Sequence, residues 1–169
     1  MENTFGRNII PQNEQQRLEN LKKYNILYTE SESAFDELAA YTAAVFDMPI
    51  AMINFVDKDN VWTKAIQEGE HHYKVERGSS LCALAILKDE VTVFENALKE
   101  RCLLANPYVA AENGLRFYAA APIGTTEGYN IGVICIIDRQ PREFGLEDQA
   151  VLESIARMVE LEIEKRIHG

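Results

Sequence analysis

The sequence predicts an α+β domain with a mainly antiparallel sheet. Short apolar runs with strand-like alternation come in neighbouring pairs joined by brief turns, and segments with helical periodicity stand before, between and after them. Helices and strands therefore do not alternate one by one, as they would in a parallel α/β fold. At 169 residues, the chain is long enough for one domain with its own core.

The N-terminal part of the chain contains two predicted helices. Residues 1–12 have no clear period and are expected to form a flexible arm, which leaves residues 13–169 as a single domain. Residues 13–27 carry apolar side chains at helical spacing among charged ones. A second helix is predicted to begin at Ser33, a candidate N-cap, and to end before Pro49.

The predicted strands follow in two hairpins. Residues 50–56 and 61–66 flank the turn-forming residues 57–60, and residues 115–123 and 131–138 flank a glycine-containing connection. Between these hairpins, residues 81–87 are apolar almost all round, which is typical of a short buried helix, and residues 91–94 form a third strand candidate. Residues 146–168 are predicted to form a long closing helix.

Composition excludes several classes of function. Asp and Glu outnumber Lys and Arg by 27 to 17, and no basic patch is present, so neither nucleic acid nor an anionic membrane is an expected partner. Residues 1–11 contain no apolar run resembling a signal peptide, and no stretch approaches 18 apolar residues, so neither a signal peptide nor a membrane span is expected. Its three cysteines indicate a reduced, cytoplasmic protein. Without a CxxC pair, and with His71 and His72 adjacent, no metal site is expected.

Seven short segments together carry a family resemblance: RLENLKKYNIL (17–27), AFDEL (34–38), PIA (49–51), FVD (55–57), SLCA (80–83), RFYAAAP (116–122) and GVICIIDRQPR (132–142). In this order and at these separations they resemble a GAF domain, a small sensory module of bacterial signalling proteins, in the subgroup found with histidine kinases and diguanylate cyclases. The resemblance covers nearly the whole chain. It implies a PAS/profilin-like antiparallel sheet of five or six strands, with the terminal helices on one face and a ligand pocket of loops and short helices on the other.

The resemblance also implies a set of ligand-binding residues around that pocket. These are Phe55, Trp62, Lys64, Arg77, Cys82, Phe117 and Ile136. Cys82 stands out because free N–H groups at the start of a helix lower the pKa of a thiol, although cysteine is also a common small core residue. The aromatic residues likewise suit either a flat ligand or a sheet core. Leu84 replaces the histidine that relatives commonly carry beside the cysteine, which disfavours a bilin chromophore, and no cofactor is identified.

The long C-terminal helix points to a partner. Its apolar side chains span roughly 180° of arc, wider than one core-facing stripe of about 100°. The surplus covers either the first helix of the same chain or a second subunit in a C2 dimer. The expected homodimer interface comprises Leu18, Leu21, Leu152, Val159, Ile163 and Ile167.

The predicted function is a small-molecule-binding or redox-sensing GAF module in bacterial signal transduction, not an enzyme, that signals through its terminal helices to a separate protein. One alternative resembles free methionine-(R)-sulfoxide reductase, with Cys82 and Cys102 as the catalytic pair, although Cys102 does not align with the family pattern and Cys135 is expected in the strand core. A cyclic-nucleotide site would use Arg77 or Arg116, but the family's marker residues are not recognisable. A further alternative is a dimerisation domain without a ligand.

Overall fold

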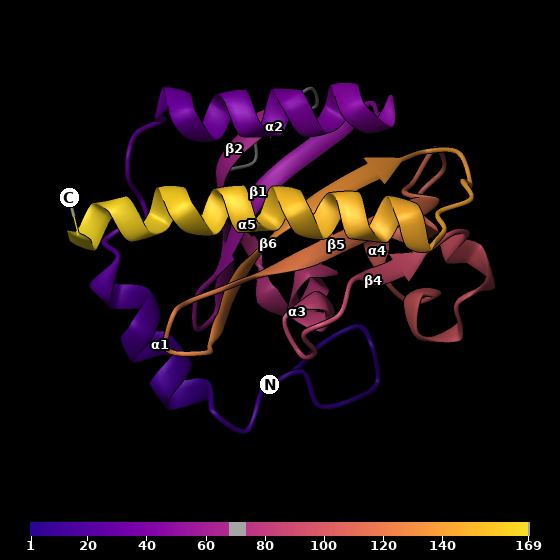
Figure 1. Ribbon diagram of the computed structural model, residues 1–169. Coiled ribbons are helices and arrows are strands. Elements are labelled where there is room, and N and C mark those ends of the chain that lie inside the picture. Colours follow the sequence, from indigo (N-terminus) through magenta and orange to yellow (C-terminus); the bar gives the residue numbers. More distant parts are fainter. Residues whose placement is uncertain (68–73, 169) are drawn as a thin grey trace.

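The computed structural model describes residues 1–67 and 74–168, so His71 and His72 lie outside the described residues. Six strands form one antiparallel sheet in the order β3-β2-β1-β6-β5-β4 (Figure 1). This arrangement confirms the predicted fold class. The strands are β1 (Ile50–Val56), β2 (Asn60–Gln67), β3 (Lys74–Glu76), β4 (Thr92–Phe94), β5 (Phe117–Gly124) and β6 (Asn130–Asp138).

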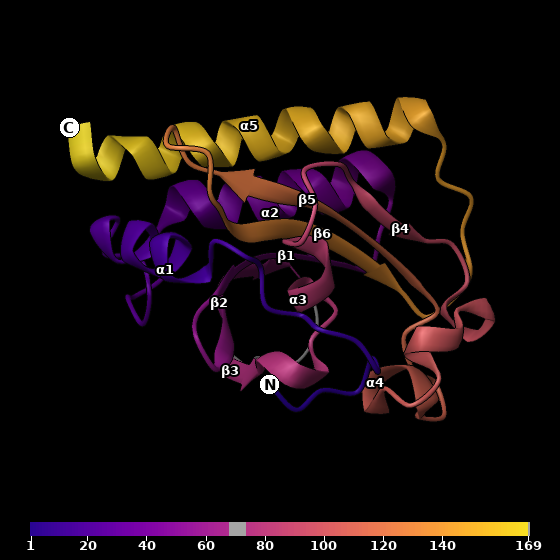
Figure 2. The ribbon, with the colours of Figure 1, turned by 90° about the horizontal axis from the view of Figure 1, so that it is seen from below.

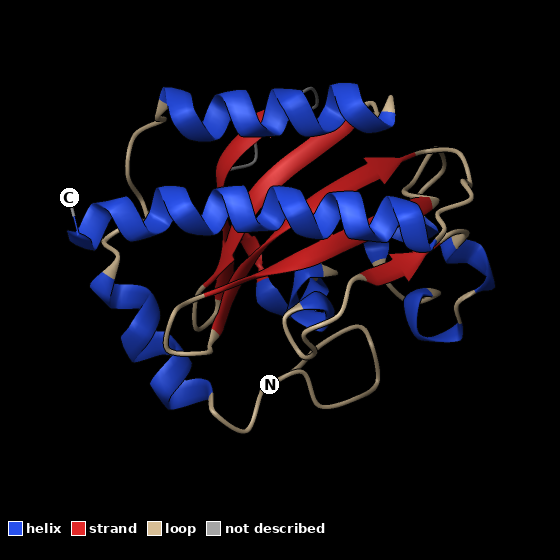
Figure 3. Cartoon of the chain, in the orientation of Figure 1, coloured by secondary structure: helices blue, strands red, loops and turns tan. Residues whose placement is uncertain are grey.

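The two long helices cover one face of the sheet, and the short elements cover the other. Figures 1 and 2 show α2 and α5 side by side over one face, with α3 and the N-terminal residues beneath the opposite face. Figure 3 shows how loops join the short helical elements on that second face. None of the helices in the described residues is long and apolar enough to span a membrane. The helices are α1 (Glu14–Lys23), α2 (Ser33–Phe46), α3 (Cys82–Ala85), α4 (Pro107–Ala110) and α5 (Leu146–His168), with 3-10 turns η1 (Arg77–Ser79), η2 (Ala97–Lys99) and η3 (Arg101–Leu103).

The larger core lies between the sheet and the helices α2 and α5. Because side chains alternate along a strand, β5 and β6 send Phe117 and Ile136 to this face and their sequence neighbours to the other. The ring of Phe117 packs against that of Phe144, with centroids 5.5 Å apart. Burial of each such large side chain contributes about 1.5–3 kcal/mol, so this layer holds the helices to the sheet.

The N-terminal residues 1–12 are packed, contrary to the expectation of a flexible arm. Phe5 and Ile9 are buried in the second core, which lies beneath α3. The backbone N–H of Thr4 donates to the carbonyl of Gly78 at 2.9 Å. A Cβ atom on Gly78 would lie 2.4 Å from the carbonyl oxygen of Glu2, so the arm passes here only because this residue is glycine.

Helix ends differ from the predicted ones where residues adopt left-handed conformations. The first helix stops at Lys23 rather than continuing to residue 27, since Asn25 (φ 48°) and Tyr28 (φ 59°) break the helical path. Ser33 is the first residue inside α2 rather than its N-cap, and Glu32 occupies the cap position without a side-chain bond. Neither glycine nor proline occupies the two positions with positive φ angles, so the sequence does not indicate where the first helix ends.

Candidate functional site

A buried polar cluster surrounds Cys82 on the α3 face of the sheet. Cys82 begins α3 and its side chain is directed at the sheet, which leaves the residue only 3% exposed. The hydroxyl of Tyr118 on β5 donates to Cys82 Sγ at 3.3 Å, and Asn54 Nδ2 on β1 donates to the same sulfur at 3.3 Å. Ser80 Oγ accepts the backbone N–H of Cys82 at 3.3 Å, which fixes the start of the helix. Two strands and one short helix therefore converge on one sulfur atom.

Asn54 joins this sulfur to a second one. Its Nδ2 atom also lies 3.8 Å from Cys135 Sγ on β6, and its Oδ1 accepts from Thr63 Oγ1 at 2.7 Å. The Thr63 bond crosses the β1–β2 pair at the point where the register shifts. Because its oxygen is held by Thr63, the amide presents its N–H group to the two sulfurs.

Neutral hydrogen-bond donors set the ionisation of Cys82. The hydrogen bond from the Cys135 thiol is the largest influence, and with those of Tyr118 and other neighbours it lowers the pKa of Cys82 to about 6, against the opposing effect of burial. The same hydrogen bond, together with burial, raises the pKa of Cys135 well above its usual range. Burial and the charge of Cys82 raise the pKa of Tyr118. The four-residue α3 is too short for a helix dipole to account for this, so the hydrogen bonds to the Cys82 sulfur are the cause of its lowered pKa.

Four of the predicted ligand-binding residues lie on the opposite face of the sheet from Cys82. They pack in the core beneath α2 and α5, because strand alternation directs them away from α3. The expectation that they surround a shared pocket with Cys82 is therefore corrected. These residues are Phe55, Trp62, Phe117 and Ile136.

The two predicted ligand-binding cations are held by structural ion pairs. Lys64 Nζ lies 2.5 Å from a carboxylate oxygen of Glu32 and donates to Thr29 Oγ1 at 2.8 Å. The buried guanidinium of Arg77 pairs with the carboxylate of Glu14. Since both cations are engaged by these carboxylates, Lys64 and Arg77 fasten the N-terminal segments to the sheet instead of lining a site with Cys82.

Cys135, not Cys102, is the cysteine brought to Cys82. Cys102 lies half-buried in η3, at the edge of the core beneath α3. Cys135 was expected in the strand core, and it is fully buried there, but its sulfur also shares Asn54 with Cys82. The sequence signal that could have found Tyr118 and Cys135 is the alternation of side chains along each strand. Tyr118 follows Phe117 and Cys135 precedes Ile136, so both lie on the strand face opposite those two core residues.

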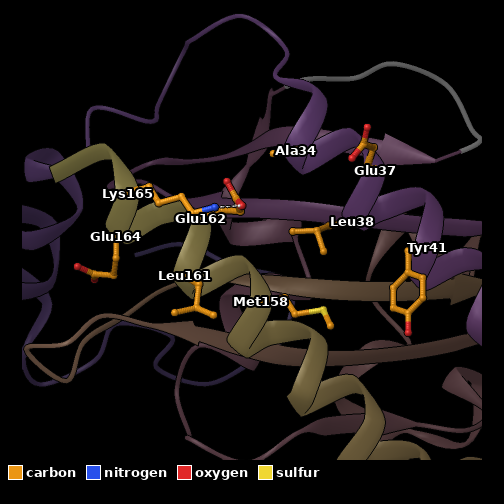
Figure 4. A pocket seen from close by; sticks show the side chains of 9 residues that line it. All are labelled: Ala34, Glu37, Leu38, Tyr41, Met158, Leu161, Glu162, Glu164 and Lys165. Atoms are coloured by element: carbon orange, nitrogen blue, oxygen red, sulfur yellow. Dashed lines mark hydrogen bonds and ion pairs between the residues drawn. The ribbon is translucent and has the colours of Figure 1, made fainter. Parts of the chain in front are cut away.

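The face beneath α3 is a core of buried side chains, whereas an open groove lies between α2 and α5. The groove has a volume of about 780 Å³, and Figure 4 shows apolar side chains from both helices directed into it. Leu161 is its most exposed apolar residue, at 66%. Its lining comprises Ala34, Glu37, Leu38, Tyr41, Met158, Leu161, Glu162, Glu164 and Lys165.

Most of the predicted dimer residues are buried within the single chain. Leu21, Leu152, Val159 and Ile163 pack in the core, which leaves them no surface to offer a partner. Leu18 is half-buried and Ile167 is exposed. The apolar residues that α5 exposes instead are Leu146, Val151, Met158, Leu161 and Ile167.

Comparison with protein families decides the classification of the chain. The GAF domain family matches residues 30–163, which is most of its length. The chain belongs to the GAF domain family. This finding confirms the family resemblance, and the match covers the short segments from residue 34 to residue 142.

The GAF domain is similar to part of a bacterial signalling enzyme. It is 36% identical over 150 residues to a cyclic di-GMP phosphodiesterase of Pseudomonas aeruginosa, covering 88% of this chain and 25% of that protein. The chain thus spans about a quarter of the length of that curated relative.

Two solved structures show the same fold at low identity. The GAF domain of an Acinetobacter phosphoenolpyruvate-protein phosphotransferase matches with a TM-score of 0.66 at 15% identity, over 92% of this chain and 95% of that one. A type II free methionine-R-sulfoxide reductase of Thermoplasma acidophilum matches with a TM-score of 0.61 at 20% identity, over 78% of this chain and 93% of that one.

These relatives correct one prediction. The expectation that the chain is not an enzyme is contradicted, because the curated relative is a phosphodiesterase and the Thermoplasma acidophilum protein is a reductase. The prediction had relied on the failure of Cys102 to align with the reductase pattern, and a GAF fold by itself supports both sensory and catalytic proteins.

Proposed function

We propose that this GAF domain is a thiol-responsive sensory module of a cytoplasmic bacterial signalling protein and that it regulates cyclic di-GMP turnover. The similarity to one quarter of a cyclic di-GMP phosphodiesterase supports the signalling context. The input is a small reactive molecule that modifies Cys82, since Cys82 is only 3% exposed and lies within the core beneath α3.

The observation that carries this proposal is the position of β6 between the thiol cluster and the helices. Cys135 faces α3 from one side of β6, while Ile134 and Ile136 pack beneath α2 and α5 from the other. A change at Cys82 that shifts β6 would therefore alter the packing under both helices. A signal is transmitted if that packing differs between two states of the domain.

The output surface is the groove between α2 and α5, and its occupant is a second copy of the chain. Met158 and Leu161 supply an apolar centre, while Glu37 and Lys165 place both signs of charge at its edge. A C2 axis sets the same patch against itself, so Lys165 of one copy can approach Glu37 of the other. The homodimer therefore uses exposed residues of α2 and α5 in place of the buried ones that the sequence indicated.

The dimer can be tested by sedimentation equilibrium with matched charge substitutions. We expect the wild-type protein at twice its 19.2 kDa chain mass and Leu161→Glu at the mass of one chain. Leu104→Glu places the same charge on a similarly exposed leucine away from the groove and should remain dimeric. Leu161→Glu at twice the chain mass, with an unchanged circular dichroism spectrum, would show that the groove is not the interface.

The sensory coupling has its own test. In a Cys102→Ser background, methyl methanethiosulfonate should modify Cys82, and the dimer dissociation constant should then change by about fivefold or more, the lower range of allosteric coupling. The same treatment of a Cys82→Ser variant should leave that constant unchanged. A modified Cys82, verified by mass, with an unaltered dissociation constant would exclude transmission from this site to the helices.

A second candidate is reduction of free methionine-R-sulfoxide, and the lowered pKa of Cys82 favours it. The Cys82 thiolate would attack the sulfoxide sulfur, which releases methionine and leaves Cys82 as a sulfenic acid. A second thiol would then attack the Cys82 sulfur, which releases water and forms a disulfide. Dithiothreitol-dependent loss of methionine sulfoxide should then vanish in Cys82→Ser. An inactive wild-type protein would remove this candidate, and activity that persists in Cys102→Ser would exclude Cys102 as the resolving cysteine.

A further inference from the structure

Cys82 and Cys135 form a buried thiol pair whose sulfurs share one hydrogen-bond donor. They are 53 positions apart in the sequence, yet Asn54 Nδ2 lies 3.3 Å from one sulfur and 3.8 Å from the other. Both sulfurs therefore lie on the α3 side of the sheet within reach of one amide group. Cys82 is 3% exposed and Cys135 is 0% exposed. Each thiol is thus the other's nearest candidate for covalent reaction.

The surroundings favour one thiolate and one thiol. The two side chains that donate to the Cys82 sulfur, Tyr118 and Asn54, are neutral, and so is the neighbouring thiol of Cys135. Neutral donors stabilise a thiolate without a counter-cation. When the sulfur is oxidised and loses its negative charge, no buried cation is therefore left without a partner. Cys135 keeps its proton and is therefore suited to the second step of a two-step oxidation, not the first.

We propose that Cys82 and Cys135 are a modification site, at which a hydroperoxide converts the two thiols into an intramolecular disulfide. Cys82 is the residue attacked first and Cys135 is the resolving cysteine. The chemistry stands independently of the function proposed above. It deepens that function only by naming the class of molecule that supplies the signal.

The reaction balances with hydrogen peroxide as the oxidant. The Cys82 thiolate attacks one peroxide oxygen, the O–O bond breaks, and the departing hydroxide takes a proton from solvent to become water. Cys82 is then a sulfenic acid. The Cys135 sulfur attacks the Cys82 sulfur, the S–O bond breaks, and the hydroxyl leaves with the Cys135 proton as a second water. Two thiols have lost two electrons and two protons, and one peroxide has become two waters.

Disulfide formation should move α3 more than the sheet. A disulfide holds its sulfurs about 2.05 Å apart, closer than two unbonded sulfur atoms can approach. β6 is paired along its length with β1 and β5, whereas α3 has four residues and lies between loops. The hydroxyl of Tyr118 and the amide of Asn54 also lose their charged acceptor. The oxidised domain therefore differs from the reduced one beneath α3.

The pair can be tested by thiol counting in the Cys102→Ser variant, which removes the remaining cysteine and with it disulfides between chains. After hydrogen peroxide treatment and alkylation in denaturant, we expect the free thiols to fall from two to none, with an intact mass lower by two hydrogen atoms. Dithiothreitol should restore both thiols. Two thiols remaining under peroxide that fully oxidises free dithiothreitol, or a mass higher by oxygen atoms alone, would overturn the proposal.

Single-cysteine variants separate the two roles. With Cys102 and Cys135 both changed to Ser, the sulfenic acid at Cys82 should persist and react with dimedone. With Cys102 and Cys82 both changed to Ser, Cys135 should remain a free thiol. Dimedone labelling at Cys135 in the second variant would reverse the assigned order. The thiol count in the Cys102→Ser variant does not depend on the folding of these double variants, so the disulfide remains testable if one of them is unstable.

This experiment also distinguishes the disulfide from the sensory proposal. A disulfide that forms without changing the dimer dissociation constant would support the thiol pair and contradict the proposed signalling. A dissociation constant that responds to modification of Cys82, with no disulfide after peroxide, would support the proposed signalling and contradict the thiol pair.

Discussion

Glu14→Gln provides the sharpest energetic test of how the N-terminal segment is fastened over the α3 face. The Glu14 carboxylate pairs with Arg17 Nε at 2.8 Å and with the guanidinium of Arg77. These two side chains are 1% and 0% exposed, while that of Glu14 is 17% exposed. Gln keeps the shape of the side chain and removes its charge, which leaves two buried cations beside each other without their shared carboxylate.

The expected cost follows from this burial. Removing one partner of a buried ion pair costs about 3–5 kcal/mol, and we take about 3 kcal/mol because Glu14 keeps some contact with solvent. For 169 residues the entropy of unfolding is about 0.35 kcal/mol per kelvin, so Tm should fall by about 9 °C. Urea unfolding can be followed by fluorescence of the single tryptophan, Trp62.

The pH dependence gives a second signature of the same substitution. Burial alone would raise the pKa of Glu14, but the hydrogen bonds from Arg77 and Arg17 lower it below its usual 4.5. A carboxyl with a lowered pKa stabilises the fold above its unfolded-state pKa, and this contribution is lost as the pH falls through the lower folded-state value. The difference in stability between wild type and Glu14→Gln should therefore shrink below about pH 4.5.

A matched control on the same helix completes the test. Glu19 is exposed, so Glu19→Gln should change stability by less than about 0.5 kcal/mol. If Glu14→Gln costs no more than this control, or if its cost is the same at every pH, the buried pairs do not fasten the segment as argued.

Two further predictions concern access to Cys82 and its ionisation. The rate at which iodoacetamide alkylates Cys82, followed by peptide mass spectrometry, should fall as the pH is lowered through about 6. Tyr118→Phe should move the midpoint of this pH profile upward, because one donor to the thiolate is lost. A midpoint near the usual pKa of a thiol in the wild type would contradict the hydrogen-bond argument. Gly78→Ala places a Cβ atom 2.4 Å from the Glu2 carbonyl oxygen, so the N-terminal residues must shift and alkylation should accelerate by roughly fivefold, as a loss of about 1 kcal/mol in opening free energy implies. Gly145→Ala, which meets nothing within 4 Å, is its control and should leave the rate unchanged.

The sequence was sufficient for the elements that depend on local pattern. The short apolar runs of residues 50–56 and 131–138 predicted β1 and β6 to within one residue, because a strand buried on both faces is a nearly continuous apolar segment bounded by turn residues. The first helix was overextended because Asn25 and Tyr28 adopt positive φ angles, which a periodic pattern does not reveal.

The candidate site was only partly predictable. Cys82 could be singled out from its place at the start of a short apolar helix. Its partners Asn54, Tyr118 and Cys135 come from three different strands, and they meet because the register and phase of β1, β5 and β6 bring them to one side of the sheet. A single sequence contains the alternation within each strand but not the way those alternations align across neighbours.

The C-terminal helix shows the same division. Its sequence alone determined that α5 is apolar over a wider arc than one core-facing stripe, and hence that two surfaces compete for it. Only the tertiary structure decided that Leu152 and Val159 face the sheet while Met158 and Leu161 face outward into the groove with α2. The physical reason is the rotation of the helix about its own axis, which is set by packing against α2 and β5 and not by any residue of the helix considered alone.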